Sequence, residues 1–140
     1  MIIDIRRAIE VLVPNAKWDY SVPNEGGTEA QYNNIRWTDE RMKPAWSSIE
    51  AAAETFATAD ALAMRQGMTC SPLQMRRALR TAGLYDAVVD WVATQPTEVS
   101  EAWEYATSFD RLDPFIIAAV PGLGKTDEEV DQIFQLAVTL

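Results

Sequence analysis

The sequence contains no histidine and only one cysteine, Cys70. Histidine is the commonest general base and a frequent metal ligand, so its absence argues against zinc sites and against Ser-His-Asp or Cys-His nucleophile systems. A lone cysteine cannot form an internal disulfide, which favours a reducing compartment. These two shortages exclude the commonest routes to catalysis. We therefore expect a protein that is not an enzyme and that holds no cofactor or metal.

Long apolar runs and basic residues are scarce as well. No apolar run reaches the roughly 18 residues that span a bilayer, and the first ten residues mix acidic and basic side chains instead of forming a secretory apolar region. The chain has 12 Lys and Arg against 21 Asp and Glu, for a net charge of −9. An acidic surface repels phosphates and anionic membranes. We therefore expect a cytosolic product with no nucleic-acid partner and no membrane partner.

The sequence does contain the material for a folded core. Apolar residues make up 48% of its 140 residues, a length that can bury a core without disulfides or metals. The spacing of these residues predicts an α+β protein that is mostly α. We expect two domains, a helix–hairpin–helix docking domain over 1–67 and a small helical bundle over 68–140.

The N-terminal domain shows both helical and strand periodicity. Apolar residues at helical spacing predict a helix over 3–13. Alternation predicts a strand over 16–22 and a second, bulged strand over 29–37, which would pair as an antiparallel hairpin. Pro44 suits the first position of a long Ala- and Glu-rich helix that we expect to end at Gly67.

The C-terminal domain is divided by capping residues, prolines and glycines. Ser71-Pro72 and Asp113-Pro114 are N-cap plus first-position pairs, and Gly83 is a helix-ending signal. These signals and the apolar stripes between them predict five short helices, at 72–82, 84–95, 97–107, 114–120 and 127–140.

One segment, "AAVPGLGKTDEE" at 118–129, resembles a nucleotide-binding P-loop. Its Gly-Lys-Thr matches the end of G-x-x-x-x-G-K-[ST], but Ala119 occupies the position of the first glycine. Only fourteen residues follow Thr126 here, too few for further βα units, and three acidic residues beside it would repel a triphosphate. Cap signals predict a helix–turn–helix joint instead. Nucleotide binding through Lys125 stays as a remote alternative.

Aromatic and arginine residues are the candidates for contact with a partner. A two-stranded hairpin cannot cover both of its faces, so its aromatic residues are interface candidates, although burial in the core would also explain them. Three arginines on one helix could face an acidic partner, and a solvated helix face is the alternative explanation. The candidate contact residues are Trp18, Tyr20, Tyr32, Trp37, Arg76, Arg77 and Arg80.

Several segments resemble phage proteins. "MIIDIRRAIEVLVPNAKWDYSV" and "YNNIRWTDERMKPAWSSIEAA" resemble the N-terminal domain of XkdW-type proteins of tailed phages and defective prophages, with Ala45 where the family pattern has Thr. "SPLQMRRALRTAGLYDAVVDWV" and "WEYATSFDRLDPFI" are similar to the C-terminal part of small proteins encoded near phage tail-fibre genes. The matches cover most of the chain, and they bring no catalytic residues with them.

The resemblance implies a tail component or a tail-assembly helper. Our leading hypothesis is a structural protein of the virion tail, present in the host cytoplasm during assembly, that contacts a tail or tail-fibre subunit. A second copy of the chain is a further candidate partner. The alternative is a tail-fibre assembly chaperone that is absent from the mature virion.

Overall fold

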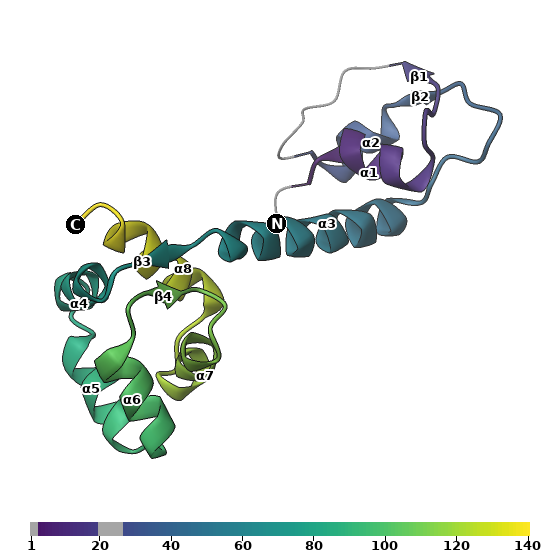
Figure 1. Cartoon of the computed structure of the whole chain (residues 1–140). Coiled ribbons are helices and arrows are strands. Elements are labelled where there is room, and N and C mark those ends of the chain that lie inside the picture. Colours follow the sequence, from purple (N-terminus) through teal and green to yellow (C-terminus); the bar gives the residue numbers. More distant parts are fainter. Residues whose placement is uncertain (1–2, 20–26) are drawn as a thin grey trace. The chain divides into compact units, whose positions relative to one another are not determined.

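The computed structural model describes residues 3–19 and 27–140 (Figure 1). These residues form eight helices and two small antiparallel sheets, which confirms the predicted mostly-α, α+β fold. The chain divides into two compact units, Met1–Ala61 (unit 1) and Leu62–Leu140 (unit 2), and the division lies within one long helix, α3 (Trp46–Gln66).

Unit 1 begins with helix α1 (Ile5–Leu12). Asp4 caps this helix, because its carboxylate accepts a hydrogen bond of 2.9 Å from the amide of Arg7. Strand β1 (Trp18–Asp19) pairs antiparallel with β2 (Arg36–Trp37), so that the predicted hairpin pairing is present, with Trp18 opposite Trp37.

The predicted second strand over 29–37 is wrong for most of its length. Only β2 is a strand, and the segment before it is a short helix, α2 (Glu29–Asn33). A capping box explains the difference. Thr28 Oγ1 accepts from the amide of Gln31, and Gln31 Oε1 accepts from the amide of Thr28. The end of the predicted first strand, 20–22, lies outside the described residues.

The long helix predicted after Pro44 is confirmed as α3, which begins two residues later than expected. The amide of Ile49 donates to the carbonyl of Ala45, which closes its first turn. Its buried side chains join those of α1 and α2 in the core of unit 1, which contains Ile3, Ile5, Ala8, Ile9, Tyr32, Ile35, Ile49, Ala52 and Ala53.

Unit 2 contains the five predicted short helices. They are α4 (Pro72–Thr81), α5 (Tyr85–Ala93), α6 (Thr97–Tyr105), α7 (Pro114–Gly122) and α8 (Asp127–Ala137). A small sheet that the sequence does not predict joins them, with β3 (Thr69–Cys70) antiparallel to β4 (Phe109–Asp110). None of the described helices is long and apolar enough to cross a membrane.

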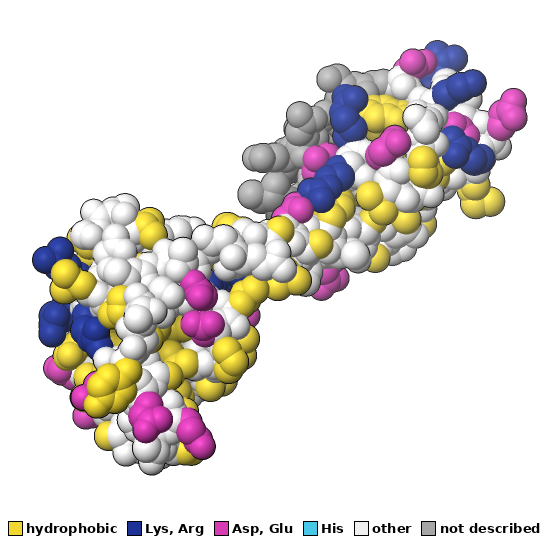
Figure 2. Space-filling model, viewed as in Figure 1, with side chains coloured by type: hydrophobic (Ala, Val, Ile, Leu, Met, Phe, Trp, Pro, Cys, Tyr) yellow, Lys and Arg dark blue, Asp and Glu magenta, His cyan; other side chains and the backbone are white. Residues whose placement is uncertain are grey.

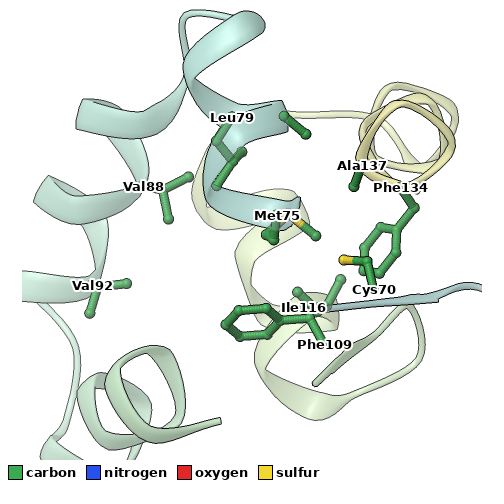
Figure 3. Close-up of a cluster of buried hydrophobic side chains, with 10 residues drawn as sticks. Cys70, Met75, Leu79, Val88, Val92, Phe109, Ile116, Phe134 and Ala137 are labelled. Carbon is green, nitrogen blue, oxygen red and sulfur yellow. The ribbon is translucent and has the colours of Figure 1, made fainter. Parts of the chain in front are cut away.

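The core of unit 2 lies among α4, α5, α7, α8 and the small sheet (Figure 3). Phe109 and Phe134 are its largest apolar side chains, and Met75 and Ile116 pack against them. Cys70 is also buried here, and that burial raises the pKa of its thiol to about 11. The thiol is therefore protonated at neutral pH and serves as a small apolar residue.

Candidate protein-contact site

Helix α4 packs one face against the core of unit 2 and carries the three candidate arginines at the remaining positions. Ser71 and Gln74 form a capping box at its start, and Pro72 occupies the first helical position. Met75, Ala78 and Leu79 are buried at helical spacing. The arginines at intervening positions therefore point away from the core.

Two of these arginines lie over aromatic rings. The guanidinium of Arg76 lies 4.9 Å from the ring centroid of Trp103, and one of its nitrogens donates to the Trp103 carbonyl at 2.9 Å. The guanidinium of Arg80 lies 4.1 Å from the ring centroid of Tyr85. Such stacking leaves the planar edge of a guanidinium able to bind a carboxylate.

The rings beneath the arginines form a connected platform. Tyr85 and Trp103 have centroids 6.2 Å apart, and Trp103 also contacts the rings of Phe109 and Phe115 at 5.8 and 6.2 Å. Phe109 is only 2% exposed. The aromatic platform therefore anchors the arginines to the core of the unit.

Within residues 3–19 and 27–140, the arginines of α4 differ from the other cations of unit 2 in having no acidic partner. Unit 2 has six basic residues, and three of them pair with carboxylates: Arg65, Arg111 and Lys125. The other three have no carboxylate oxygen within 4.0 Å among the described residues. Figure 2 shows dark-blue side chains gathered over α4. We call this patch the arginine surface; it contains Arg76, Arg77, Arg80 and Tyr85.

This arrangement suits the binding of an acidic protein surface. Arg, Tyr and Trp are the residues that contribute most to protein interfaces, and stacked arginines lose little conformational freedom on binding. Arg77 and Arg80 are exposed, whereas Arg76 is partly buried by its contact with Trp103. Arg77 and Arg80 are therefore the residues that offer the most free donors.

The candidate aromatic residues of unit 1 are placed differently. Trp18 and Trp37 are half-buried and pack against the core, and Trp37 Nε1 donates to the Arg41 carbonyl at 2.6 Å. Tyr32 is 1% exposed, so its side chain offers no surface to a partner and it is no longer a candidate. Its hydroxyl donates to the carbonyl of Pro44, which explains how its polar end is satisfied. Tyr20 lies outside the described residues.

Sequence reasoning missed a buried ion-pair network in unit 2. Arg111 is 2% exposed and donates to Asp131 at 2.7 Å and to Asp127 at 2.7 Å. Arg65, at the end of α3, donates to the same Asp131 carboxylate at 2.9 Å. The spacing of the two aspartates, i and i+4 on α8, was the available signal, since it places both carboxylates on one helix face.

The P-loop-like segment is a helix–turn–helix joint, as its cap signals predict. It connects α7 to α8, and Gly124 adopts a φ of 62°, a left-handed value that favours glycine. Thr126 Oγ1 accepts from the amide of Glu129, and Lys125 Nζ pairs with the Glu129 carboxylate at 3.3 Å. Among the residues that the structure describes, no group of acidic or cysteine side chains could hold a metal ion.

No family model, curated protein or solved structure matches this chain. The resemblance to XkdW-type proteins therefore stays a prediction from the sequence.

Proposed function

We propose that this protein is a phage tail-associated structural protein that works by binding other proteins. Its arginine surface would contact an acidic surface of a tail or tail-fibre subunit. The phage context comes from the resemblance of its sequence segments, and the contact function comes from the arginine surface. The protein would do no chemistry of its own.

The observation that carries this proposal is the group of three α4 arginines, which have no acidic partner among the described residues of a chain with net charge −9. An acidic protein can satisfy its few cations internally, as Arg65 and Arg111 show. Three arginines lie together on the outer positions of α4, two of them stacked on aromatic rings, so their positive charges lie close to one another. Such a group of charges guides an acidic partner to one orientation.

A capture experiment tests the contact. The tagged chain and its R77E/R80E variant would be co-expressed with the tail and tail-fibre proteins of the same phage, and captured proteins would be identified. We expect the wild-type chain to retain a partner that the variant loses, and high salt to weaken the wild-type complex. A matched variant, R6E/R36E, makes the same charge change in unit 1 and should retain the partner. Equal capture by all three would reject the arginine surface as the contact.

The protein content of purified virions tests the structural role. A structural component is present at a constant copy number in mature particles. A tail-fibre assembly chaperone would be needed in infected cells and absent from particles. Mass spectrometry of particles and of assembly extracts therefore distinguishes the two functions.

A further inference from the structure

Unit 2 has a groove whose chemistry is opposite to that of the arginine surface. Helices α6 and α7 enclose a hollow of about 360 Å³. Most of its lining is apolar, and we call that part the floor; its two carboxylate-bearing residues, Glu98 and Asp113, we call the acidic edge. The apolar lining comes from Val99, Ala102, Pro114, Phe115 and Ala118.

The two acidic residues of the groove carry no cation in the described protein. Neither Glu98 nor Asp113 forms an ion pair among the described residues, and the Asp113 carboxylate accepts a hydrogen bond of 3.2 Å from the amide of Asp110. An apolar floor with acidic edges fits a side chain that has an apolar stem and a cationic end. Arginine is such a side chain.

The exposed ridge of α4 has the matching chemistry. Leu73, Arg77 and Arg80 are spaced i, i+4 and i+7, so they lie along one face of the helix. Leu73 is 56% exposed although it is apolar. The ridge therefore offers one aliphatic side chain for an apolar floor and two cations for acidic edges.

We propose that the α4 ridge of one copy of this chain binds in the α6–α7 groove of a second copy. This inference goes beyond the proposed function, because it gives the arginine surface a second partner, another copy of the chain, beside the tail subunit. The ridge and the groove are different surfaces of unit 2, and Figure 2 shows magenta side chains over α6 apart from the dark-blue group over α4. A copy that uses its ridge toward one neighbour and its groove toward another makes a head-to-tail contact, which can repeat from copy to copy.

The aromatic platform connects the two surfaces. Phe115 lines the groove, and its ring centroid lies 6.2 Å from that of Trp103. The ring centroid of Trp103 lies 6.2 Å from that of Tyr85, over which Arg80 of the ridge is stacked. Both binding surfaces are thus in contact with one connected cluster of rings. Each copy would use one surface toward the copy before it and the other toward the copy after it.

Light scattering coupled to size-exclusion chromatography tests the self-association of the purified full-length chain. We expect the mass to exceed the 15.6 kDa of one chain, to rise with protein concentration and to fall with salt. The R77A/R80A variant loses the ridge cations, and E98R places a cation at the groove edge. We expect each to associate roughly tenfold or more weakly than wild type.

Mixing the two variants gives the decisive result. R77A/R80A retains an intact groove, and E98R retains an intact ridge, so an equimolar mixture should form a complex of two chains and nothing larger. The matched variants R6A/R36A and E54R make the equivalent changes of charge at residues of unit 1 and should associate like wild type. A wild-type chain that stays monomeric at low salt and high concentration, or an E98R variant that associates like wild type, would overturn the proposal.

The capture experiment separates this inference from the proposed function. If the wild-type chain is monomeric while R77E/R80E still loses its tail partner, self-association is rejected and the contact with the tail stands. If the chain self-associates through the ridge while R77E/R80E captures the same tail proteins as wild type, the proposed contact between the arginine surface and the tail fails. The salt dependence of the wild-type mass tests the charged contact without any substitution.

Discussion

At the scale of single residues, the charged groups of this chain fall into two classes. Arg111 and Asp131 are buried and hydrogen-bonded to each other, whereas Arg7 and Asp60 form an ion pair on the surface of unit 1. Burial makes the first pair costly to break, because a remaining partner would be left as an unpaired charge away from water. Solvent screens the second pair.

Asp131→Ala should lower the free energy of unfolding by about 3 to 5 kcal/mol, since it leaves the buried Arg111 with only the half-exposed Asp127 as its acidic partner. Urea unfolding followed by tryptophan fluorescence measures the change. Asp60→Ala is the control, because it removes one partner of an exposed pair and should have a much smaller effect. Similar losses of unfolding free energy for both variants would show that the buried network contributes no more to stability than an exposed ion pair.

Asp127 gives unit 2 a predictable response to acid. Its hydrogen bond with Arg111 lowers the pKa of the carboxyl below the ordinary value of 3.8. The unfolded chain therefore binds a proton more readily than the folded chain as the pH falls, so the stabilisation is present above about pH 4 and is lost below it. The urea midpoint, measured at a series of pH values, should therefore decrease as the pH is lowered below about 4. Asp127→Asn should make the decline shallower, and an unchanged pH profile would contradict this assignment.

At the scale of elements, caps and close contacts decide where the helices of unit 2 begin and end. Thr126 starts α8 through a capping box with Glu129, which is why the P-loop-like residues form a turn. Gly122 ends α7 where the ring of Trp91 approaches its backbone, and an added Cβ there would overlap the indole. Both features belong to the same short connection between α7 and α8.

Thr126→Ala should lower the free energy of unfolding by about 1 kcal/mol, because the amide of Glu129 loses its acceptor at the start of α8. Lys125→Ala is the neighbouring control and should change stability less, since its pair with Glu129 is solvent-exposed. Chemical denaturation of both variants gives the comparison. A larger loss for Lys125→Ala would indicate a role for that lysine beyond the turn.

Gly122→Ala should destabilise the protein by about 1 to 3 kcal/mol, because the new methyl group must displace Trp91. Gly67→Ala is a matched control. Its Cβ would meet nothing closer than the Met64 carbonyl at 3.7 Å, so we expect a neutral or slightly stabilising effect. Equal unfolding midpoints for the two variants would contradict the close packing of Trp91 on α7.

At the scale of the whole molecule, each unit has a core of its own. The core of unit 1 comes from α1, α2 and α3, and that of unit 2 comes from its five helices and small sheet. A unit with a separate core can fold as an independent domain. The last turns of α3 belong to unit 2 through Arg65, whose guanidinium binds Asp131.

The fragment 62–140 should unfold cooperatively in urea and keep a near-ultraviolet circular dichroism spectrum typical of packed aromatic rings. The fragment 68–140, which follows the domain boundary predicted from the sequence, lacks Arg65 and should be less stable, since Asp131 then retains Arg111 alone. Extending the fragment to include Arg65 should restore the lost stability. Equal stability of the two fragments would place the boundary of the domain after α3.

Local sequence signals were sufficient where an element depends on its own residues. Ser71-Pro72 and Thr126 marked the starts of two helices correctly, because a cap is a contact between near neighbours. Asp113-Pro114 also marked the start of α7, but the Asp113 side chain makes no capping hydrogen bond there, and Pro114 at the first helical position is the signal that held. A capping signal was overlooked at Thr28, where a capping box turned part of an expected strand into α2. The prediction was wrong because it relied on the alternation of apolar and polar residues in a segment whose capping box favours a helix.

The sequence by itself determined the helical character of this protein, the order of most of its elements and the three arginines on α4. Only the tertiary structure decided which charges are paired and which side chains are exposed. Tyr32 and Arg111 are the clearest cases, since one is an aromatic residue and the other a cation, and both are buried. The physical reason is that burial and ion pairing depend on residues far apart in the chain, such as Arg65 and Asp131. A local sequence pattern does not predict that such residues come into contact.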